Sequence, residues 1–287
     1  MKICRFNANR LGLIEADEVL DVTAALDVLP SCKYPYPLGD QLIAHLDQVC
    51  EKIISIKASA QRFSLSEVQL LAPVANPTKI IGAPINYDDH IAESRDDNNI
   101  AHGRKISSIH DWGLFLKASS SLIGFGEQII LRHPERRNDH EGELAVIIGK
   151  RCDRVSVTEA LDYVAAYSIG LDMTARGPEF QCWRKSIDTY SVLGPWMVTA
   201  DEISNPDDLK LSLSVNGQLR QDGSTKYLIV GVAELIAWAS SMYVLHPGDI
   251  IMTGTPAGVG PVHPGDLIEA SVQNIGKAQV QVANYYD

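Results

Sequence analysis

Along the first seventy positions, the pattern of apolar and polar residues predicts three short strands and one helix. Alternating runs cover residues 1–6, 10–15 and 18–22, with turn-forming residues between them. In residues 41–57 apolar positions recur at helical spacing, so we expect an amphipathic helix there. The proline-rich segment 30–39 should be irregular. This part of the chain is therefore predicted to form a small α+β unit.

After residue 74 the pattern changes to short apolar runs separated by glycine and proline, and we place a domain boundary there, between residues 1–74 and 75–287. Residues 144–149 form a continuous apolar run, which is typical of a strand buried on both faces. Residues 93–112 are polar and lack apolar periodicity, which favours a mobile loop or lid. The other predicted elements are strands at 79–81, 167–172, 209–216 and 267–272, and helices at 88–94 (capped by Asn86 or Asp88), 156–167 and 230–243.

Strands predominate after residue 74, and the few predicted helices do not alternate with them in a regular way. A Rossmann fold or an α/β barrel requires this alternation, so both are disfavoured. We expect a mixed α+β fold, with a small amino-terminal domain followed by a larger, strand-rich one.

Composition narrows the classes of partner. The 287 residues carry 25 Lys and Arg against 36 Asp and Glu, a formal charge of −11, which argues against binding to nucleic acid or to an anionic membrane. The apolar runs are too short to span a bilayer, and the first residues lack the apolar core of a signal peptide. The five cysteines are scattered and form no CxxC pair, so disulfides and a zinc–thiolate site are not expected. We therefore expect a cytoplasmic protein.

Three carboxylates stand at the ends of the predicted buried strands. Glu141 and Glu143 are two residues apart just before the run 144–149, and Asp172 ends the apolar run 167–172. Residues two apart on a strand project from the same face, and two adjacent buried carboxylates repel each other unless a cation lies between them. A hard divalent ion such as Mg²⁺ or Mn²⁺ would remove this cost. The alternatives are a solvated strand end for the glutamates and a helix cap for Asp172.

Two lysines and one histidine are further candidates. Lys117 closes the largely apolar run 113–117, and Lys185 follows Trp183 and Arg184. Both could balance the three carboxylates, although a lysine that closes an apolar run commonly extends to solvent. His90 and Glu93 are three positions apart on the predicted helix 88–94, so they can touch. A carboxylate on one imidazole nitrogen makes the other nitrogen a better base. By itself, however, this spacing is more often a surface pair.

The glycine-rich segment 252–261 lacks the Lys-Ser/Thr of a P-loop, so nucleotide binding is not expected. Its backbone amides and the Thr255 hydroxyl could instead approach a carboxylate closely, because glycine allows such an approach.

Taken in order, these motifs resemble the fumarylacetoacetate hydrolase family. They are NYDDHIAE (86–93), FLK (115–117), EGELAVIIG (141–149), DMTAR (172–176), KSIDT (185–189) and TGTPAGVG (253–260). The resemblance covers the chain from about Pro77 onward. Two places differ from the usual family pattern: Leu171 replaces an asparagine, and residues 177–183 differ from the usual glutamine-bearing segment.

The resemblance implies a mixed β-roll or β-sandwich fold, a homodimer, and one Mg²⁺ or Mn²⁺ that binds a 2-oxo acid substrate. It implies the following roles: metal ligands Glu141, Glu143 and Asp172; catalytic residues His90, Glu93 and Lys117; substrate-binding residues Tyr87, Arg176, Gln181, Lys185 and Thr255.

The first functional hypothesis is a metal-dependent hydrolase of acylpyruvates, such as maleylpyruvate or fumarylpyruvate, acting in the breakdown of aromatic compounds. His90 would activate water for attack on the distal carbonyl, and cleavage of the C3–C4 bond would give pyruvate. The alternatives are an oxaloacetate-type decarboxylase, a 2-hydroxyhepta-2,4-diene-1,7-dioate isomerase or decarboxylase, and a non-catalytic binding protein with the same fold. The sequence alone does not distinguish hydrolysis, decarboxylation and isomerisation, because the three reactions share the metal-binding half of the site.

Overall fold

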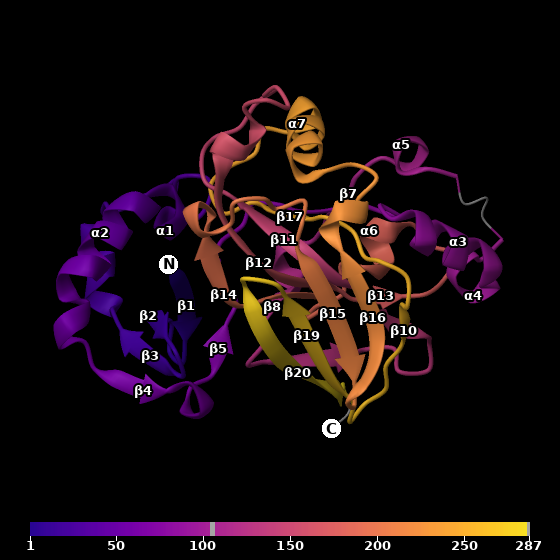
Figure 1. Cartoon of the computed structure of the whole chain (residues 1–287), viewed down its shortest axis with the longest axis horizontal. Helices are drawn as coiled ribbons and strands as arrows, with labels where there is room; N and C mark the ends of the chain where they lie inside the picture. The colour runs from indigo at the N-terminus through magenta and orange to yellow at the C-terminus, as the bar shows by residue number, and fades with distance from the viewer. Residues whose placement is uncertain (104–106, 286–287) are drawn as a thin grey trace.

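The computed structural model describes residues 1–103 and 107–285. Its largest sheet crosses the whole molecule, with the amino-terminal elements at one end and the helices around residues 88–101 at the other (Figure 1). Its strands, in spatial order, are β4 (Arg62–Ser64), β3 (Glu18–Asp21), β2 (Arg10–Glu15), β1 (Lys2–Phe6), β14 (Ser191–Thr199), β12 (Val164–Asp172), β11 (Gly142–Ile148), β17 (Ile250–Met252), β6 (Ile80–Gly82) and β7 (Phe115–Lys117), with β5 (Leu70–Leu71) paired to β1 and β8 (Leu122–Gly124) paired to β14.

Two smaller sheets complete the architecture of the described residues. One consists of β16 (Gln218–Ser224), β15 (Lys210–Val215), β19 (Leu267–Val272), β20 (Gly276–Asn284) and β9 (Gln128–Leu131), and the other of β13 (Thr174–Ala175), β10 (Asn138–His140) and β18 (Gly260–Pro261). Helix α7 (Val232–Met242) matches the predicted helix 230–243. Strands β15 and β19 alternate buried and less buried residues as the pattern predicted. The predicted mixed α+β fold is confirmed.

The amino-terminal meander continues into the main sheet. Strand β1 pairs antiparallel with β14, in the register Lys2 with Val198 and Ile3 with Met197. One buried apolar cluster combines residues from both sides of the predicted boundary, including Ile3 and Ile147. The two predicted domains therefore share a sheet and part of a core, and the division at residue 74 stays a prediction.

The predicted helix 41–57 is interrupted. Helix α1 (Gln41–Ala44) ends at His45, whose backbone leaves the helical region (φ −120°, ψ 26°), and α2 (Leu46–Ile56) follows. Asp40 caps α1 by accepting from two of its backbone amides, and its other oxygen accepts from the amides of Ala75 and Asn76, both at 2.9 Å. Segment 30–39 is irregular, as predicted.

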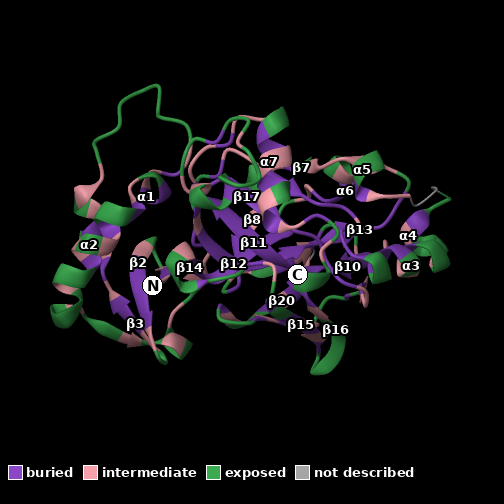
Figure 2. Ribbon diagram, turned by 45° about the horizontal axis from the view of Figure 1, so that its top comes forward, coloured by how far each residue is buried: buried purple, intermediate pink, exposed green. Residues whose placement is uncertain are grey.

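The centre of the main sheet is fully buried. Every residue of β11 is buried, as the apolar run 144–149 predicted, and the central strands are purple in Figure 2 while α2 and the loop before α1 carry much of the exposed surface. The predicted helix 156–167 is wrong: only a short 3₁₀ turn (Ala160–Tyr163) forms, and Val164 already begins β12. Pairing of β12 between β11 and β14 stabilises an extended chain there, which overrides the local helical pattern.

Residues 93–112 were predicted to form a mobile loop or lid, but most of this segment is helical. It contains the end of α3 (Asp88–Asp96), then α4 (Asn98–Ala101) and α5 (Ile109–Trp112); residues 104–106 lie outside the described part. Polar caps and a small apolar cluster stabilise these helices: Asp97 caps α4, Ser108 caps α5, and Ala101 and Trp112 pack with Ile91. Asp97 also forms an ion pair with Arg137 at 2.7 Å.

The predicted cap of α3 is also wrong. The residue at the cap position is Tyr87, which makes no side-chain capping bond. The Asn86 amide instead donates to the backbone carbonyls of Val230 (2.9 Å) and Thr253 (2.8 Å), so it joins three segments that are distant in the sequence.

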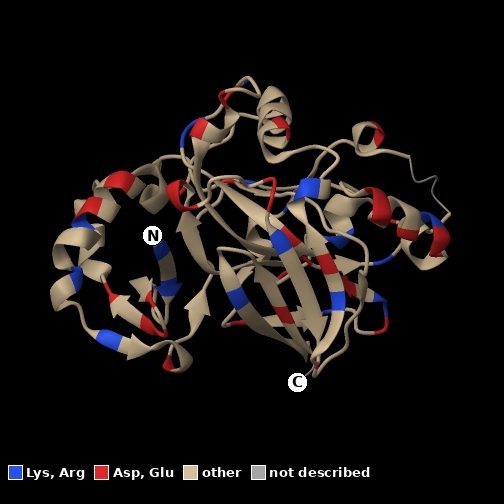
Figure 3. Ribbon diagram, viewed as in Figure 1, with Lys and Arg blue, Asp and Glu red and all other residues tan. Residues whose placement is uncertain are grey.

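Charged residues of both signs are interspersed along the outer helices and strands (Figure 3). Within the described residues, no helix is both long enough and apolar enough to cross a bilayer.

Candidate active site

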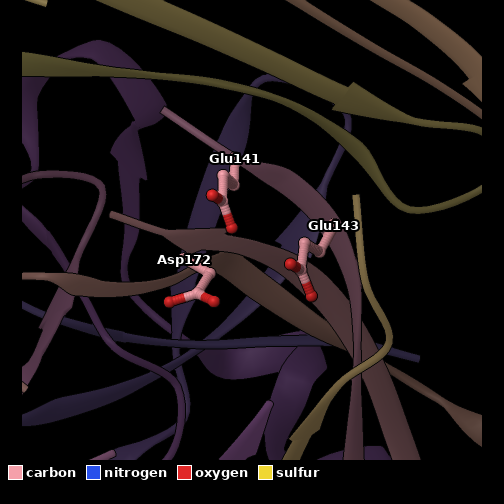
Figure 4. Close-up of side chains that lie close together, drawn as sticks. All are labelled: Glu141, Glu143 and Asp172. Carbon is pink, nitrogen blue, oxygen red and sulfur yellow. The ribbon is translucent and has the colours of Figure 1, made fainter. Parts of the chain in front are cut away.

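The three predicted carboxylates come together where β11 and β12 meet. Glu141 directly precedes β11, Glu143 lies within it, and Asp172 ends β12. The backbone amide of Asp172 donates to the carbonyl of Glu141 (2.9 Å), which brings the strand ends together. One ligand atom from each side chain lies within 4.8 Å of the others, and the side chains converge in Figure 4. All three residues are at least 96% buried.

Basic side chains contact this cluster. Lys117 Nζ donates to Asp172 Oδ1 (2.5 Å) and to the carbonyl of Tyr190 (2.6 Å). Lys185 Nζ donates to Glu141 Oε2 (2.7 Å) and Asp172 Oδ2 (2.6 Å). Arg176 Nη2 donates to Glu141 Oε1 (2.9 Å). The burial of Glu141 and Asp172 is therefore compensated by charged donors, as buried charges require.

The environments of the two glutamates differ. Burial raises the pKa of Glu143 well above its usual value, and the nearby carboxylates of Asp172 and Glu141 add to this shift. Burial also opposes ionisation of Glu141, but Lys185 and Arg176 outweigh it and hold the pKa of Glu141 well below its usual value. Burial lowers the pKa of Lys117 although Asp172 opposes that shift. The three acidic groups provide oxygen ligands in one small volume, a donor set that fits a hard divalent cation.

His90 and Glu93 form the predicted pair on α3. His90 Nδ1 lies 2.9 Å from Glu93 Oε2, and the other oxygen of Glu93 accepts from the backbone amide of Gly258 (3.0 Å). His90 is buried, so the surface-pair alternative does not describe it. A carboxylate fixed on Nδ1 leaves Nε2 as the proton acceptor of the ring.

The glycine-rich loop donates backbone hydrogen bonds to a carboxylate of the cluster, Glu143, and to the partner of His90, Glu93. The amide of Gly254 donates to Glu143 Oε2 (2.7 Å), and that of Gly258 donates to Glu93. Gly254 has a φ of +101°, and a Cβ there would lie 2.7 Å from the Cβ of Asn86, so only glycine fits. The sequence predicted that backbone amides of this loop approach a carboxylate. In the structure, the carboxylates that they contact are the protein's own Glu143 and Glu93.

One cavity connects these groups. Seven of the predicted site residues line it: His90, Glu141, Glu143, Arg176, Gln181, Lys185 and Thr255. Asp172 and Lys117 do not line the cavity; Asp172 accepts from Lys185, which does, and from Lys117. Tyr87 is buried and does not line this cavity, and its contact with substrate stays a prediction.

Comparison with known proteins identifies the family. Residues 79–283 match the family described as fumarylacetoacetate (FAA) hydrolase, C-terminal. The chain belongs to the fumarylacetoacetate hydrolase family. The resemblance inferred from the ordered motifs is thus confirmed.

Individual members of the family are similar over most or all of the chain. The chain is 54% identical to maleylpyruvate hydrolase of Aquipseudomonas alcaligenes, covering 98% of this chain and 99% of that one. A crystal structure of maleylpyruvate hydrolase from Sphingobium sp. SYK-6, in complex with manganese(II) and pyruvate, has a TM-score of 0.83 and 36% identity over 99% of both chains. The mitochondrial oxaloacetate tautomerase of Rattus norvegicus is 35% identical, covering 74% of this chain and 68% of that one.

The sequence analysis missed two buried polar residues, Asp139 and Gln221, that contact residues of the candidate site. Asp139 is fully buried and accepts from Arg176 Nε and Arg137 Nε, both at 2.8 Å. Gln221, on β16, is also fully buried. The only sequence signal for Asp139 is its place in the run of acidic residues at 139–143, and Gln221 lies in a strand with no local signal.

Gln221 joins the glycine-rich loop to the carboxylates. Its Nε2 donates to Thr255 Oγ1 (2.6 Å) and the carbonyl of Pro256 (2.9 Å), and its Oε1 accepts from the amide of Gly142 (2.9 Å), between the two glutamates. The side chain therefore fixes the loop relative to the start of β11.

Replacing Gln221 by Leu should lower the free energy of unfolding by about 1–3 kcal/mol, because the buried amide of Gly142 loses its partner. Denaturant unfolding measures this change. Gln218→Leu, an exposed position on the same strand, is the control and should shift the free energy by less than about 0.5 kcal/mol. Equal effects of the two substitutions would contradict the role of Gln221.

Proposed function

We propose that this protein hydrolyses a carbon–carbon bond in acylpyruvates such as maleylpyruvate, with Mg²⁺ or Mn²⁺ held by Glu141, Glu143 and Asp172. The observation that carries the proposal is that His90 and two carboxylates of the cluster line the same cavity. The 54% identity to a maleylpyruvate hydrolase over almost the whole chain supports the substrate class. The complex of the Sphingobium enzyme with manganese(II) and pyruvate supports the metal.

When bound, the divalent cation supplies a Lewis acid that stabilises negative charge on substrate oxygens. The lysines add positive charge to the same region: Lys185 contacts Glu141 and Asp172, and Lys117 contacts Asp172 from the buried side. Negative charge that develops on the pyruvate fragment is therefore stabilised by preorganised groups in a buried site.

His90 acts as the general base. Glu93 orients the imidazole through Nδ1, and Nε2 takes a proton from water. The water oxygen bonds to the distal carbonyl carbon, C4, and the C3–C4 bond then breaks. Its electron pair stays with the pyruvate fragment, which is protonated at C3, and the acyl fragment leaves as a carboxylic acid. Arg176, Gln181 and Thr255 line the cavity where they can contact the bound substrate.

The decisive experiment is identification of the products. The purified protein is incubated with maleylpyruvate, acetylpyruvate and oxaloacetate, each with Mn²⁺ or Mg²⁺. We expect pyruvate and maleate from maleylpyruvate, loss of turnover on addition of a chelator, and recovery when Mn²⁺ is restored. Turnover that is insensitive to the chelator would rule out the metal-dependent mechanism.

A tautomerase acting on oxaloacetate is the second candidate, because one relative with 35% identity is an oxaloacetate tautomerase. In that reaction His90 would only move a proton between carbon and oxygen, and no bond between carbons would break. Interconversion of the keto and enol forms of oxaloacetate, without cleavage of maleylpyruvate, would favour this candidate over the hydrolase.

We also propose a homodimer in the cytoplasm. The five cysteines are free, which suits a reducing compartment. Two exposed aromatic side chains near α6 (Gln181–Arg184), Phe180 and Trp183, are candidates for the dimer contact, since large apolar side chains of this kind are enriched at interfaces.

A further inference from the structure

Part of the cavity wall has no role in the reaction described above. Besides the carboxylate cluster and His90, the lining includes Ser94 and Arg184 together with the apolar side chains of Ile85, Ile100 and Trp112. This combination of one hydroxyl, one guanidinium and an apolar wall indicates a ligand that is both carbon-rich and anionic.

Ser94 has a buried hydroxyl with no hydrogen-bond partner among the described residues. The residue is only 1% exposed, and it lines the cavity. It lies four residues after His90 on α3, so it occupies the same face of the helix, one turn further on. Because a buried polar group is normally paired, this hydroxyl points to a group supplied by a ligand.

Arg184 places a second basic group on the same wall. It ends α6, directly before Lys185, and it is 5% exposed. Its Nε donates to the carbonyl of Glu179 (3.2 Å), which holds the side chain in place. A guanidinium matches the planar geometry of a carboxylate.

Both residues line the same cavity as His90 and two carboxylates of the cluster. In the proposed function, on which this step rests, His90 activates water beside the distal carbonyl of an acylpyruvate. The acyl chain continues beyond that carbonyl, and Ser94 lies one helical turn beyond His90. The apolar residues suit the unsaturated carbons of such a chain.

We propose that Ser94 and Arg184 form a subsite for the second carboxylate of the substrate. The preferred substrates are then acylpyruvates whose acyl group ends in a carboxylate, such as maleylpyruvate, in preference to those that end in a methyl group, such as acetylpyruvate.

The test compares the two substrates with the Mn²⁺-loaded protein and its variants. Arg184→Leu should raise KM for maleylpyruvate about 10–100-fold, the range expected for loss of a charged hydrogen bond, while kcat/KM for acetylpyruvate changes less than about 3-fold. Ser94→Ala should act in the same direction by about 3–10-fold, the range of one neutral hydrogen bond. Arg151→Leu removes an exposed arginine that pairs with Asp153, and it should leave KM and kcat unchanged for both substrates.

Equal loss on both substrates in Arg184→Leu, with Ser94→Ala unchanged, would show that Arg184 only supports the fold and would overturn the subsite. Equal efficiency of the wild type on maleylpyruvate and acetylpyruvate would overturn the subsite and leave the proposed hydrolase intact.

A binding measurement separates the two proposals if neither substrate is cleaved. Calorimetry records maleate binding to the Mn²⁺-loaded protein saturated with pyruvate, which fills the other end of the cavity. Weaker maleate binding in Arg184→Leu and Ser94→Ala supports the subsite even when the hydrolase proposal fails. Unchanged affinity in both variants overturns the subsite.

Discussion

Substitution of His90 by Ala is expected to lower kcat for maleylpyruvate about 10²–10⁴-fold, the usual contribution of a general base. The affinity for Mn²⁺ should stay nearly unchanged, because the imidazole is not one of the three clustered carboxylates. Steady-state kinetics gives kcat, and titration calorimetry gives the metal affinity.

The matched control for His90 is His133→Ala. His133 also pairs with a glutamate, since its Nδ1 lies 3.1 Å from Glu135 Oε1, but both side chains are more than half exposed. The control should keep its full kcat. Full activity in His90→Ala would eliminate this residue as the base and would direct attention to the reactions that need no activated water.

Substitution of Glu143 by Gln should weaken Mn²⁺ binding more than about 100-fold, since even the loss of a partner that only orients a ligand costs 10–100-fold. The replacement keeps the shape of the side chain, and its carbonyl oxygen can still accept from the amide of Gly254, so the loop should stay in place. Turnover at micromolar Mn²⁺ should fall with the occupancy of the site. The measurements are titration calorimetry with Mn²⁺ and thermal unfolding with and without the ion.

Glu269→Gln is the control for this substitution. Glu269 pairs with Lys277 at 2.7 Å on the outer sheet, away from the cavity lining, and its replacement should leave the metal affinity unchanged. If Glu143→Gln bound Mn²⁺ as tightly as the wild type, the ion would have to bind elsewhere, and the assignment of the cluster would be wrong.

The sequence was most informative where local pattern and tertiary structure agree. The apolar run 144–149 and the helix 230–243 have patterns that match their burial in the fold. The predicted helix 156–167 was wrong because its last residues gain more from pairing in the centre of a sheet than from a local helix, and single-chain periodicity does not register such pairing. The polar segment 93–112 is helical because its caps and a few buried apolar residues, such as Ala101, stabilise short helices that lack a repeating apolar pattern.

The site shows the same division. Glu141, Glu143 and Asp172 were predictable because each stands at the end of an apolar run. The two runs are consecutive strands that pair antiparallel, so the start of β11 lies beside the end of β12. Gln221 was not predictable, because its contacts depend on which distant segments it faces. It bonds, for example, to Thr255, 34 positions away.

The glycine-rich loop binds Glu143 through the amide of Gly254 and Glu93 through the amide of Gly258. Two main-chain amides of one loop thus link Glu93, the partner of His90, to Glu143 of the carboxylate cluster, so a shift of this loop would move both groups. Substitution of Ile85, Ile100 or Trp112 in the cavity wall would remove neither of these two hydrogen bonds, so the wall can change while the loop keeps its contacts with both groups.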